Sequence, residues 1–305
     1  MPEPLFEAAC VALHPGAQGS RLCLWHAPSH APARFLFVYV HPFAEEMNKS
    51  RRMAALQARA LAAAGHAVLQ ADLLGCGDSA GEFSDATWAA WVDDVVAACT
   101  HARVRHALAW PDASPPPLWL WGLRAGCLLA TEAATRLDAA CHLLFWQPSL
   151  QGKAVLQQFL RLKTAGALLG KSAGGSAESP RQALAAGQTV DIAGYRLGPA
   201  LAHGLDAAKL TPPARAGRLE WIEIATGADG AASPAAAAAA ALPAWSQAGW
   251  VARQRSVAGP QFWPSTEIEV ASDLIAATLL ALSQDACAAP PASGTTPPAP
   301  ALARA

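Results

Sequence analysis

Hydrophobic and polar residues alternate along the chain in a way that predicts strands and helices in turn. The segments 34–40 (RFLFVYV), 117–121 (PLWLW) and 141–149 (CHLLFWQPS) are nearly continuous apolar runs. Such runs are typical of strands that are buried on both faces of a parallel sheet. Between them, residues 51–66 and 84–104 place apolar side chains at helical spacing, with Gly65 ending the first helix and Ser84 or Asp85 as the expected N-cap of the second. The alternation predicts an α/β fold with a doubly wound, mostly parallel sheet.

The ends of the chain and one internal stretch depart from this alternation. Residues 5–13 and 20–26 predict an N-terminal hairpin, and 218–225 and 249–257 predict the last strands, before a final helix at 272–284. Regular patterning lapses at about 150–216, where an insertion or lid is expected. The predicted divisions are 1–149 and 217–285 for the two parts of the core, 150–216 for the lid, and 286–305 for a disordered, proline- and alanine-rich tail.

Composition restricts the class of protein. The 305 residues are 53% hydrophobic with a formal net charge of -1, which gives no electrostatic reason to expect a nucleic-acid partner. The seven cysteines form no C-x-x-C pair, so we expect reduced thiols. Neither a signal peptide nor an apolar run of about 18 residues is recognisable, and we therefore expect a cytoplasmic protein without a membrane span.

One turn carries the strongest chemical signal. Gly122-Leu123-Arg124-Ala125-Gly126 follows an apolar strand and precedes a helix. An α/β-hydrolase places its nucleophile in this setting, as Gly-x-Ser-x-Gly. Here both glycines are present, and Arg124 stands where the serine would be.

The order of strands, this turn and the position of the insertion resemble the α/β-hydrolase superfamily over residues 34–284. More narrowly, HPFAEEMNKSRR, DLLGCGDSAGEF, WGLRAG and GPQFW are similar to the exosortase A system-associated hydrolase, type 2. Members of that family occur beside genes for protein sorting and exopolysaccharide. The resemblance implies the name hydrolase, which reflects fold more than chemistry.

The residues themselves argue against a serine triad. An acid should follow the strand at 218–225, and Asp229 fits that position. A histidine should follow later, yet the last of the nine histidines is His203, and the expected loop holds Phe262, Trp263 and Glu267. A hydroxyl without a neighbouring base is a poor nucleophile near neutral pH.

Two other residues are candidate nucleophiles. Ser79 lies in a literal Gly-x-Ser-x-Gly, Gly77 to Gly81, but no helix follows directly, so a structural role or a place at the pocket edge is expected. Cys127 lies in the first turn of the helix after the elbow, where the pKa of a thiol can fall. The alternative for Cys127 is a small side chain that packs the helix on the sheet.

The anion-binding half of such a site is still present in the sequence. The N–H groups of Ala125 and of Phe43 or Ala44 could form an oxyanion hole. Arg124 adds a charge that fits a carboxylate or phosphate, or that pairs internally with Glu46, the first choice, or with Glu45. His41 is expected to shape the loop after its strand, and Trp263 to line the pocket.

We therefore expect an α/β-hydrolase fold used as a binding or scaffold protein, without serine-hydrolase catalysis. Its partner would be an anionic or acyl small molecule, or a protein of an exosortase or polysaccharide locus. No metal site and no cofactor is predicted. The alternative is an ester or thioester hydrolase that uses Ser79 or Cys127.

Overall fold

The computed structural model describes residues 5–13, 18–168, 179–225 and 236–283. Eight strands form one central sheet in the order β1-β2-β4-β3-β5-β6-β9-β10. Their bounds are Leu5–Val11 (β1), Arg21–Ala27 (β2), Leu36–Val40 (β3), Ala67–Ala71 (β4), Leu118–Leu123 (β5), His142–Trp146 (β6), Arg218–Ile224 (β9) and Val251–Val257 (β10). The β1–β2 and β2–β4 pairs are antiparallel and every other pair is parallel.

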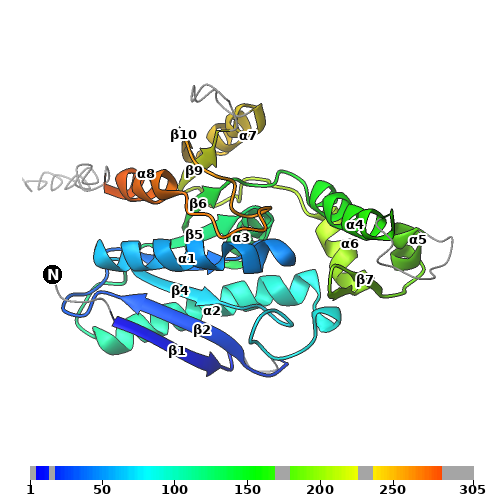
Figure 1. The fold of residues 1–305 in the computed structure, drawn as a ribbon. Coiled ribbons are helices and arrows are strands. Elements are labelled where there is room, and N and C mark those ends of the chain that lie inside the picture. Colours follow the sequence, from blue (N-terminus) through cyan, green and yellow to red (C-terminus); the bar gives the residue numbers. More distant parts are fainter. Residues whose placement is uncertain (1–4, 14–17, 169–178, 226–235, 284–305) are drawn as a thin grey trace, which may run out of the picture.

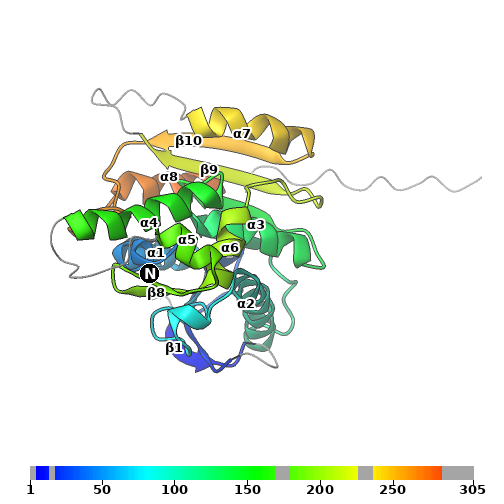
Figure 2. The same cartoon turned by 90° about the vertical axis from the view of Figure 1, so that its right-hand side faces the viewer.

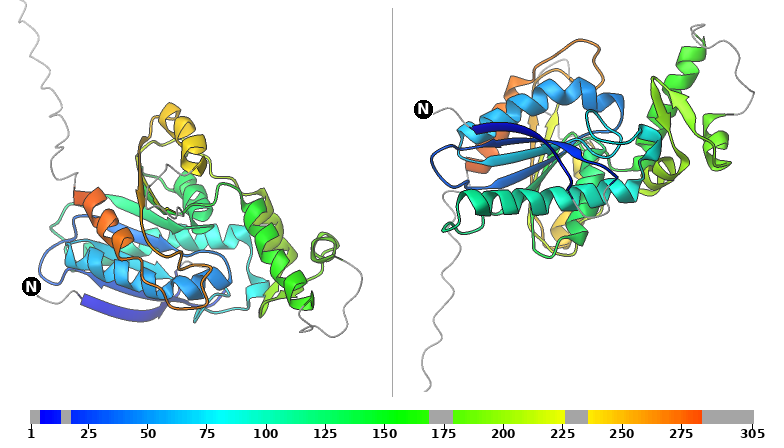
Figure 3. Two further views of the ribbon diagram at one scale, coloured as in Figure 1. Left: turned by 45° about the horizontal axis from the view of Figure 1, so that its top comes forward. Right: turned by 90° about the horizontal axis from the view of Figure 1, so that it is seen from below.

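Helices cover both faces of this sheet, as Figure 1 and the right-hand view of Figure 3 show for α1 and α2. On one face, α1 (Glu45–Ala63) and α8 (Ser272–Ser283) pack on β-strand residues such as Phe37, Trp121 and Trp146. The other face carries α2 (Trp88–Ala109), α3 (Gly126–Arg136) and α7 (Ala236–Gln247). Strands β3 and β5 are buried along their whole length, which explains why their sequences are continuously apolar.

An insertion lies between β6 and β9 and occupies one end of the molecule (Figures 1 and 2). It contains α4 (Gly152–Leu168), α5 (Pro180–Ala185), a hairpin of β7 (Val190–Ile192) and β8 (Tyr195–Leu197), and α6 (Pro199–Ala207). Helix α6 packs on α2, and β8 packs on the short 3₁₀ helix η1 (Phe83–Asp85). A Cβ on Gly204 of α6 would collide with the side chain of Trp88, so the two helices approach closely there.

Two predicted helix boundaries are wrong. Helix α1 begins at Glu45, so the expected loop after β3 ends there and Glu46, Lys49 and Arg51 are helical. Helix α2 is capped by Thr87, whose hydroxyl accepts a hydrogen bond from Ala90 N–H, and not by Ser84 or Asp85, which lie in η1. The proline- and alanine-rich tail at 286–305 lies outside the described residues. Among the helices of the described ranges, none combines the length and the apolar character needed to cross a membrane.

Candidate functional site

The turn between β5 and α3 has the backbone of a nucleophile elbow. Arg124 has a φ of 55°, a left-handed conformation that costs a non-glycine residue free energy. Its N–H donates to Trp146 O at 3.0 Å, and its carbonyl accepts from Cys127 N–H at 3.2 Å. The flanking glycines are required by packing, because a Cβ on Gly122 would lie 2.7 Å from Cys127 Cα and one on Gly126 would collide with the backbone of β3.

Arg124 is held from three sides. Its Nε lies 3.3 Å from Glu46 Oε1, in the first turn of α1, which confirms the pairing expected from the sequence. Its Nη2 donates to Gln158 Oε1 of α4 at 3.4 Å. The guanidinium carbon lies 5.6 Å from the ring centroid of Trp263, in the loop after β10, a cation–π distance. The loop that carries the histidine of a triad therefore reaches the elbow, and it delivers an indole ring there.

Glu46 is only partly compensated by this ion pair. Its side chain is 8% exposed, and its buried Oε2 has no hydrogen-bond partner among the described residues. Burial raises the pKa of Glu46 above its usual value, and the charge of Arg124 opposes this shift without cancelling it. The ion pair thus restrains both side chains, while Oε2 of Glu46 is left without a hydrogen bond in the described part of the chain.

Aromatic side chains fill the space above the elbow. Phe43 makes edge-to-face contacts with Phe83, Trp91 and Phe159, and Tyr195 of the insertion contacts Phe83 and Phe159. The cavity that remains between Phe43, Glu46 and α4 has a volume of about 10 Å³, on the order of one water molecule. A cavity of this size is too small for an acyl or anionic substrate.

The N–H groups that were expected to form an oxyanion hole have no backbone acceptor within the described ranges. Ala125 is buried and forms the N-cap of α3, and the N–H groups of Ala125 and Phe43 donate to no other backbone group of the described residues. His41 lies beside them, but its ring is fully engaged. Its Nδ1 donates to Pro42 O at 2.8 Å and its Nε2 accepts from Leu73 N–H at 3.4 Å, while burial lowers the pKa of the imidazole. His41 is thus held as a neutral residue that fixes the loop.

Ser79 joins two backbone segments. Its hydroxyl donates to Asp72 O at 2.6 Å and accepts from Leu22 N–H at 2.9 Å. The first hydrogen bond lies within the loop after β4, and the second joins that loop to β2. This arrangement favours a structural role, and no base contacts the hydroxyl among the described residues.

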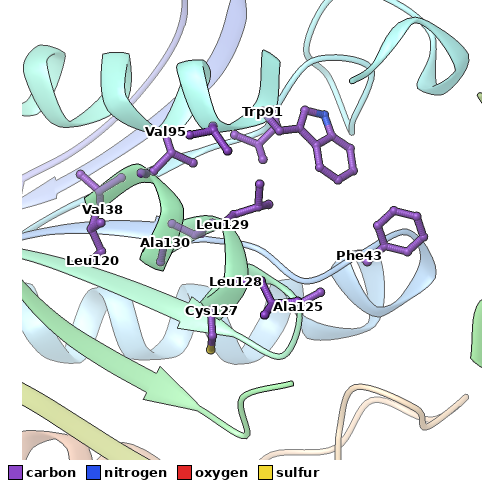
Figure 4. Close-up of a cluster of buried hydrophobic side chains, with 14 of the residues drawn as sticks. Val38, Phe43, Trp91, Val95, Leu120, Ala125, Cys127, Leu128, Leu129 and Ala130 are labelled. Carbon is purple, nitrogen blue, oxygen red and sulfur yellow. The ribbon is translucent and has the colours of Figure 1, made fainter. Parts of the chain in front are cut away.

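Cys127 lies on the inner side of α3. It is 0% exposed, and Figure 4 shows its sulfur pointing away from Phe43 and Trp91. Burial raises the pKa of this thiol well above its usual value, an effect that outweighs the nearby charge of Arg124. Such a buried thiol with a raised pKa favours the packing role over that of a nucleophile.

The remaining sequence candidates are placed as follows. Asp229 lies outside the described residues. Glu45 is half-buried beside the small cavity, and burial raises the pKa of its carboxyl. Glu267 is exposed and forms no ion pair within the described ranges. Gln158 and Tyr195 could not be identified from the sequence, because contacts between an insertion and a distant loop leave no periodic pattern.

This strand order, elbow and insertion define an α/β-hydrolase fold. No protein-family model and no curated protein sequence matches the chain. Among solved structures, the fold is similar to that of Est1E from Butyrivibrio proteoclasticus with ferulic acid bound, at a TM-score of 0.58 and 16% identity over 88% of this chain and 96% of that one. A putative hydrolase from Agrobacterium vitis gives 0.53 and 15% over 90% and 98%, respectively. An α/β serine hydrolase without lid from Xanthomonas campestris gives 0.52 and 16% over 95% and 99%.

Proposed function

We propose that this chain is a non-hydrolytic binding or scaffold protein that uses the α/β-hydrolase fold. The observation that carries the proposal is the contact set of Arg124, which stands at the elbow between Glu46 and the ring of Trp263. A serine triad needs a hydroxyl at the elbow, where Arg124 stands, and an imidazole near the position of Trp263. Here a guanidinium and an indole stand in their places, and neither can serve as nucleophile or base.

The filled cleft supports the same proposal. Phe159 and Tyr195 of the insertion meet Phe43 and Phe83 where an acyl chain would enter a hydrolase of this fold. We propose that residues 150–216 form a cap that stays packed on the core, and that the ion pair of Arg124 with Glu46 closes the former reaction centre. The oxyanion-type N–H groups and Arg124 then accept an anionic or acyl ligand only if Glu46 is displaced.

We further propose that the biological setting is an exosortase-linked protein-sorting or exopolysaccharide locus, in the cytoplasm. The support is the similarity of the four segments HPFAEEMNKSRR, DLLGCGDSAGEF, WGLRAG and GPQFW to that family. In a strain that lacks the gene, a copy carrying Ser79→Ala and Cys127→Ala together should restore polysaccharide output as well as the wild-type copy. Failure of only the double variant, at a cellular level of folded protein equal to wild type, would favour a catalytic role.

The direct test is a search for hydrolysis. The purified chain should react with no fluorophosphonate probe and turn over no p-nitrophenyl ester, of short or long acyl chain, above the uncatalysed rate. Ser79→Ala and Cys127→Ala are the matched variants. Turnover by the wild-type chain that disappears in either variant would establish an ester or thioester hydrolase with an unusual nucleophile and would overturn the proposal.

A further inference from the structure

A second cavity lies on the other side of the β3–α1 connection, between the first half of α1 and the sheet. Its volume is about 180 Å³, compared with about 10 Å³ above the elbow. Its floor is made by Leu24 of β2, Gln70 of β4 and Tyr39 of β3, three strands that are adjacent in the sheet. Helix α1, which crosses this face in Figure 1, supplies the wall.

The floor carries polar groups that the fold itself does not use. Tyr39 is 7% exposed, and its hydroxyl forms no hydrogen bond with the described residues. Gln70 is 9% exposed; one end of its amide lies 3.2 Å from His26 Nε2, and the other end is without a partner in the same part of the chain. Both side chains are more than nine-tenths buried and line the same cavity, so their unpaired polar atoms can hydrogen-bond to a polar ligand there.

The charges at the mouth cancel. Arg51 Nη2 lies 2.9 Å from Asp72 Oδ2, and that oxygen also accepts from Asp78 N–H at 3.2 Å. Asp72 lines the cavity, and its other carboxylate oxygen accepts no hydrogen bond from the described residues. The ion pair packs directly against Gly77, because a Cβ there would collide with both of its members. The lining therefore offers a hydroxyl, an amide end and a carboxylate oxygen, but no net charge that would select an ion.

The rest of the lining is apolar, from Leu24, Met47, Ala54, Ala55 and Ala71. His41 adds only its ring surface, since both its nitrogens are already hydrogen-bonded. A cavity of about 150 Å³ holds a benzene molecule, so this one holds a compact molecule of about 8 to 12 non-hydrogen atoms.

We infer that this cavity is a binding site for a small, uncharged, hydroxyl-rich molecule, of the size and chemistry of a monosaccharide or cyclitol. Hydroxyl groups of such a ligand would donate to Asp72 and pair with Tyr39 and Gln70, while its ring carbons would pack on the methyl groups of α1. Arg124 does not line this cavity, so the inference can be tested independently of the proposed function.

The test uses the full chain with D-glucose and myo-inositol as probes and saturation-transfer NMR as the readout. Both neutral probes should bind with millimolar Kd, as expected for ligands of this size. Glucuronate and glucosamine, which add a charge of either sign, should bind at least about tenfold more weakly, because Arg51 and Asp72 neutralise each other and leave no free counter-charge.

Matched substitutions on α1 locate the binding. Ala55→Leu fills the cavity and should weaken binding at least about tenfold. Ala63→Leu, the same change at an exposed position of the same helix, should leave it unchanged. Tyr39→Phe and Gln70→Leu should each weaken binding by roughly 3- to 10-fold, because one hydrogen bond is lost.

Failure of both neutral probes to bind would overturn the inference, as would binding that Ala55→Leu leaves unchanged. Equal or tighter binding of the charged probes would also overturn it, because it would show that charge and not hydroxyl pairing governs the site. Circular dichroism of each variant confirms that the fold is intact before its binding is compared.

Discussion

Two features of Arg124 are unfavourable in free energy, its left-handed backbone conformation and its charge at the floor of a filled cleft. Three hydrogen bonds to Trp146, Cys127 and Ser149 hold the backbone. Glu46, Gln158 and Trp263 hold the side chain. Contacts from its surroundings thus hold both the backbone and the side chain of Arg124 in place.

At the same residue, Arg124→Ser alone should not create an esterase. The new hydroxyl would have no base, since both nitrogens of His41 are occupied and Trp263 fills the place of a triad histidine. A p-nitrophenyl acetate assay should give the uncatalysed rate, and Arg124→Ser with Trp263→His is the variant from which a low rate is first expected. Hydrolysis by the single variant would reveal a base that lies elsewhere.

Removing one partner of the ion pair should cost more stability than removing both. Glu46→Ala leaves Arg124 uncompensated and should lower the free energy of unfolding by about 2–3 kcal/mol, less than for a fully buried pair. The discount applies because 18% of the Arg124 side chain keeps contact with water. In urea titrations, Arg124→Leu with Glu46→Leu should be less destabilised than Glu46→Ala. A double variant that is as unstable as the sum of the single ones would show that the two side chains do not interact.

The same carboxylate should make stability depend on pH. Because burial raises the pKa of Glu46 in the folded chain, the protonated form is favoured by folding. Its contribution is complete below the unfolded pKa of about 4.3 and is lost as the pH rises through the higher folded value. Relative to Glu46→Gln, the wild-type chain should therefore lose stability from about pH 4 upward and then reach a plateau, as measured by urea unfolding at a series of pH values. The opposite slope would mean that Arg124 dominates over burial.

At the scale of elements, the start of α2 allows an expected N-cap, Ser84, to be compared with the observed one, Thr87. Thr87→Ala removes the hydroxyl that accepts from Ala90 N–H and should lower the free energy of unfolding by about 1 kcal/mol. Ser84→Ala, three positions earlier in η1, should change it by less than about 0.5 kcal/mol. Thermal unfolding of the two variants side by side decides between the caps, and equal losses would contradict the assignment.

The elements that the sequence predicted well are the long or fully buried ones. Strand β3, apolar at each position, and α8, with its helical repeat, have patterns that burial on a sheet imposes. The hairpin of β7 and β8 has only 3 residues per strand, too few for a period to be detectable. The start of α1 was missed because its N-cap, Ala44, offers no side-chain cap and has positive φ.

At the scale of the whole molecule, the sequence identified the elbow and the absent histidine but not the state of the cleft. A local motif shows which residue types occupy a turn. Arg124 in the elbow motif and Trp263 in the loop expected to hold the histidine were therefore recognisable from the sequence. Filling of the cleft depends on Phe159 and Tyr195, which meet Phe43 and Phe83 only after the insertion has folded back. Contacts of that sequence separation need the three-dimensional structure.

The composition of the C-terminal segment supports one further prediction for the whole chain. Residues 286–305 are rich in proline and alanine and offer little apolar surface to offset about 1–2 kcal/mol of backbone entropy per residue. Truncation after Asp285 should leave the Tm within about 4 °C, a shift that corresponds to at most about 1–2 kcal/mol for a chain of this size. A larger drop in calorimetry would show that the segment packs on the core.

The glycines that flank Arg124 bear on how sequences with this fold can change over generations. Gly122 and Gly126 are fixed by the approach of α3 and β3, so a substitution at either would be removed by selection for folding alone. The residue midway between them is not restricted by this close approach, so its side chain can change without loss of the fold. Two glycines at this spacing between a strand and a helix are therefore evidence of a shared fold. The residue midway between them is the part of the motif that indicates whether the chain can carry out the chemistry.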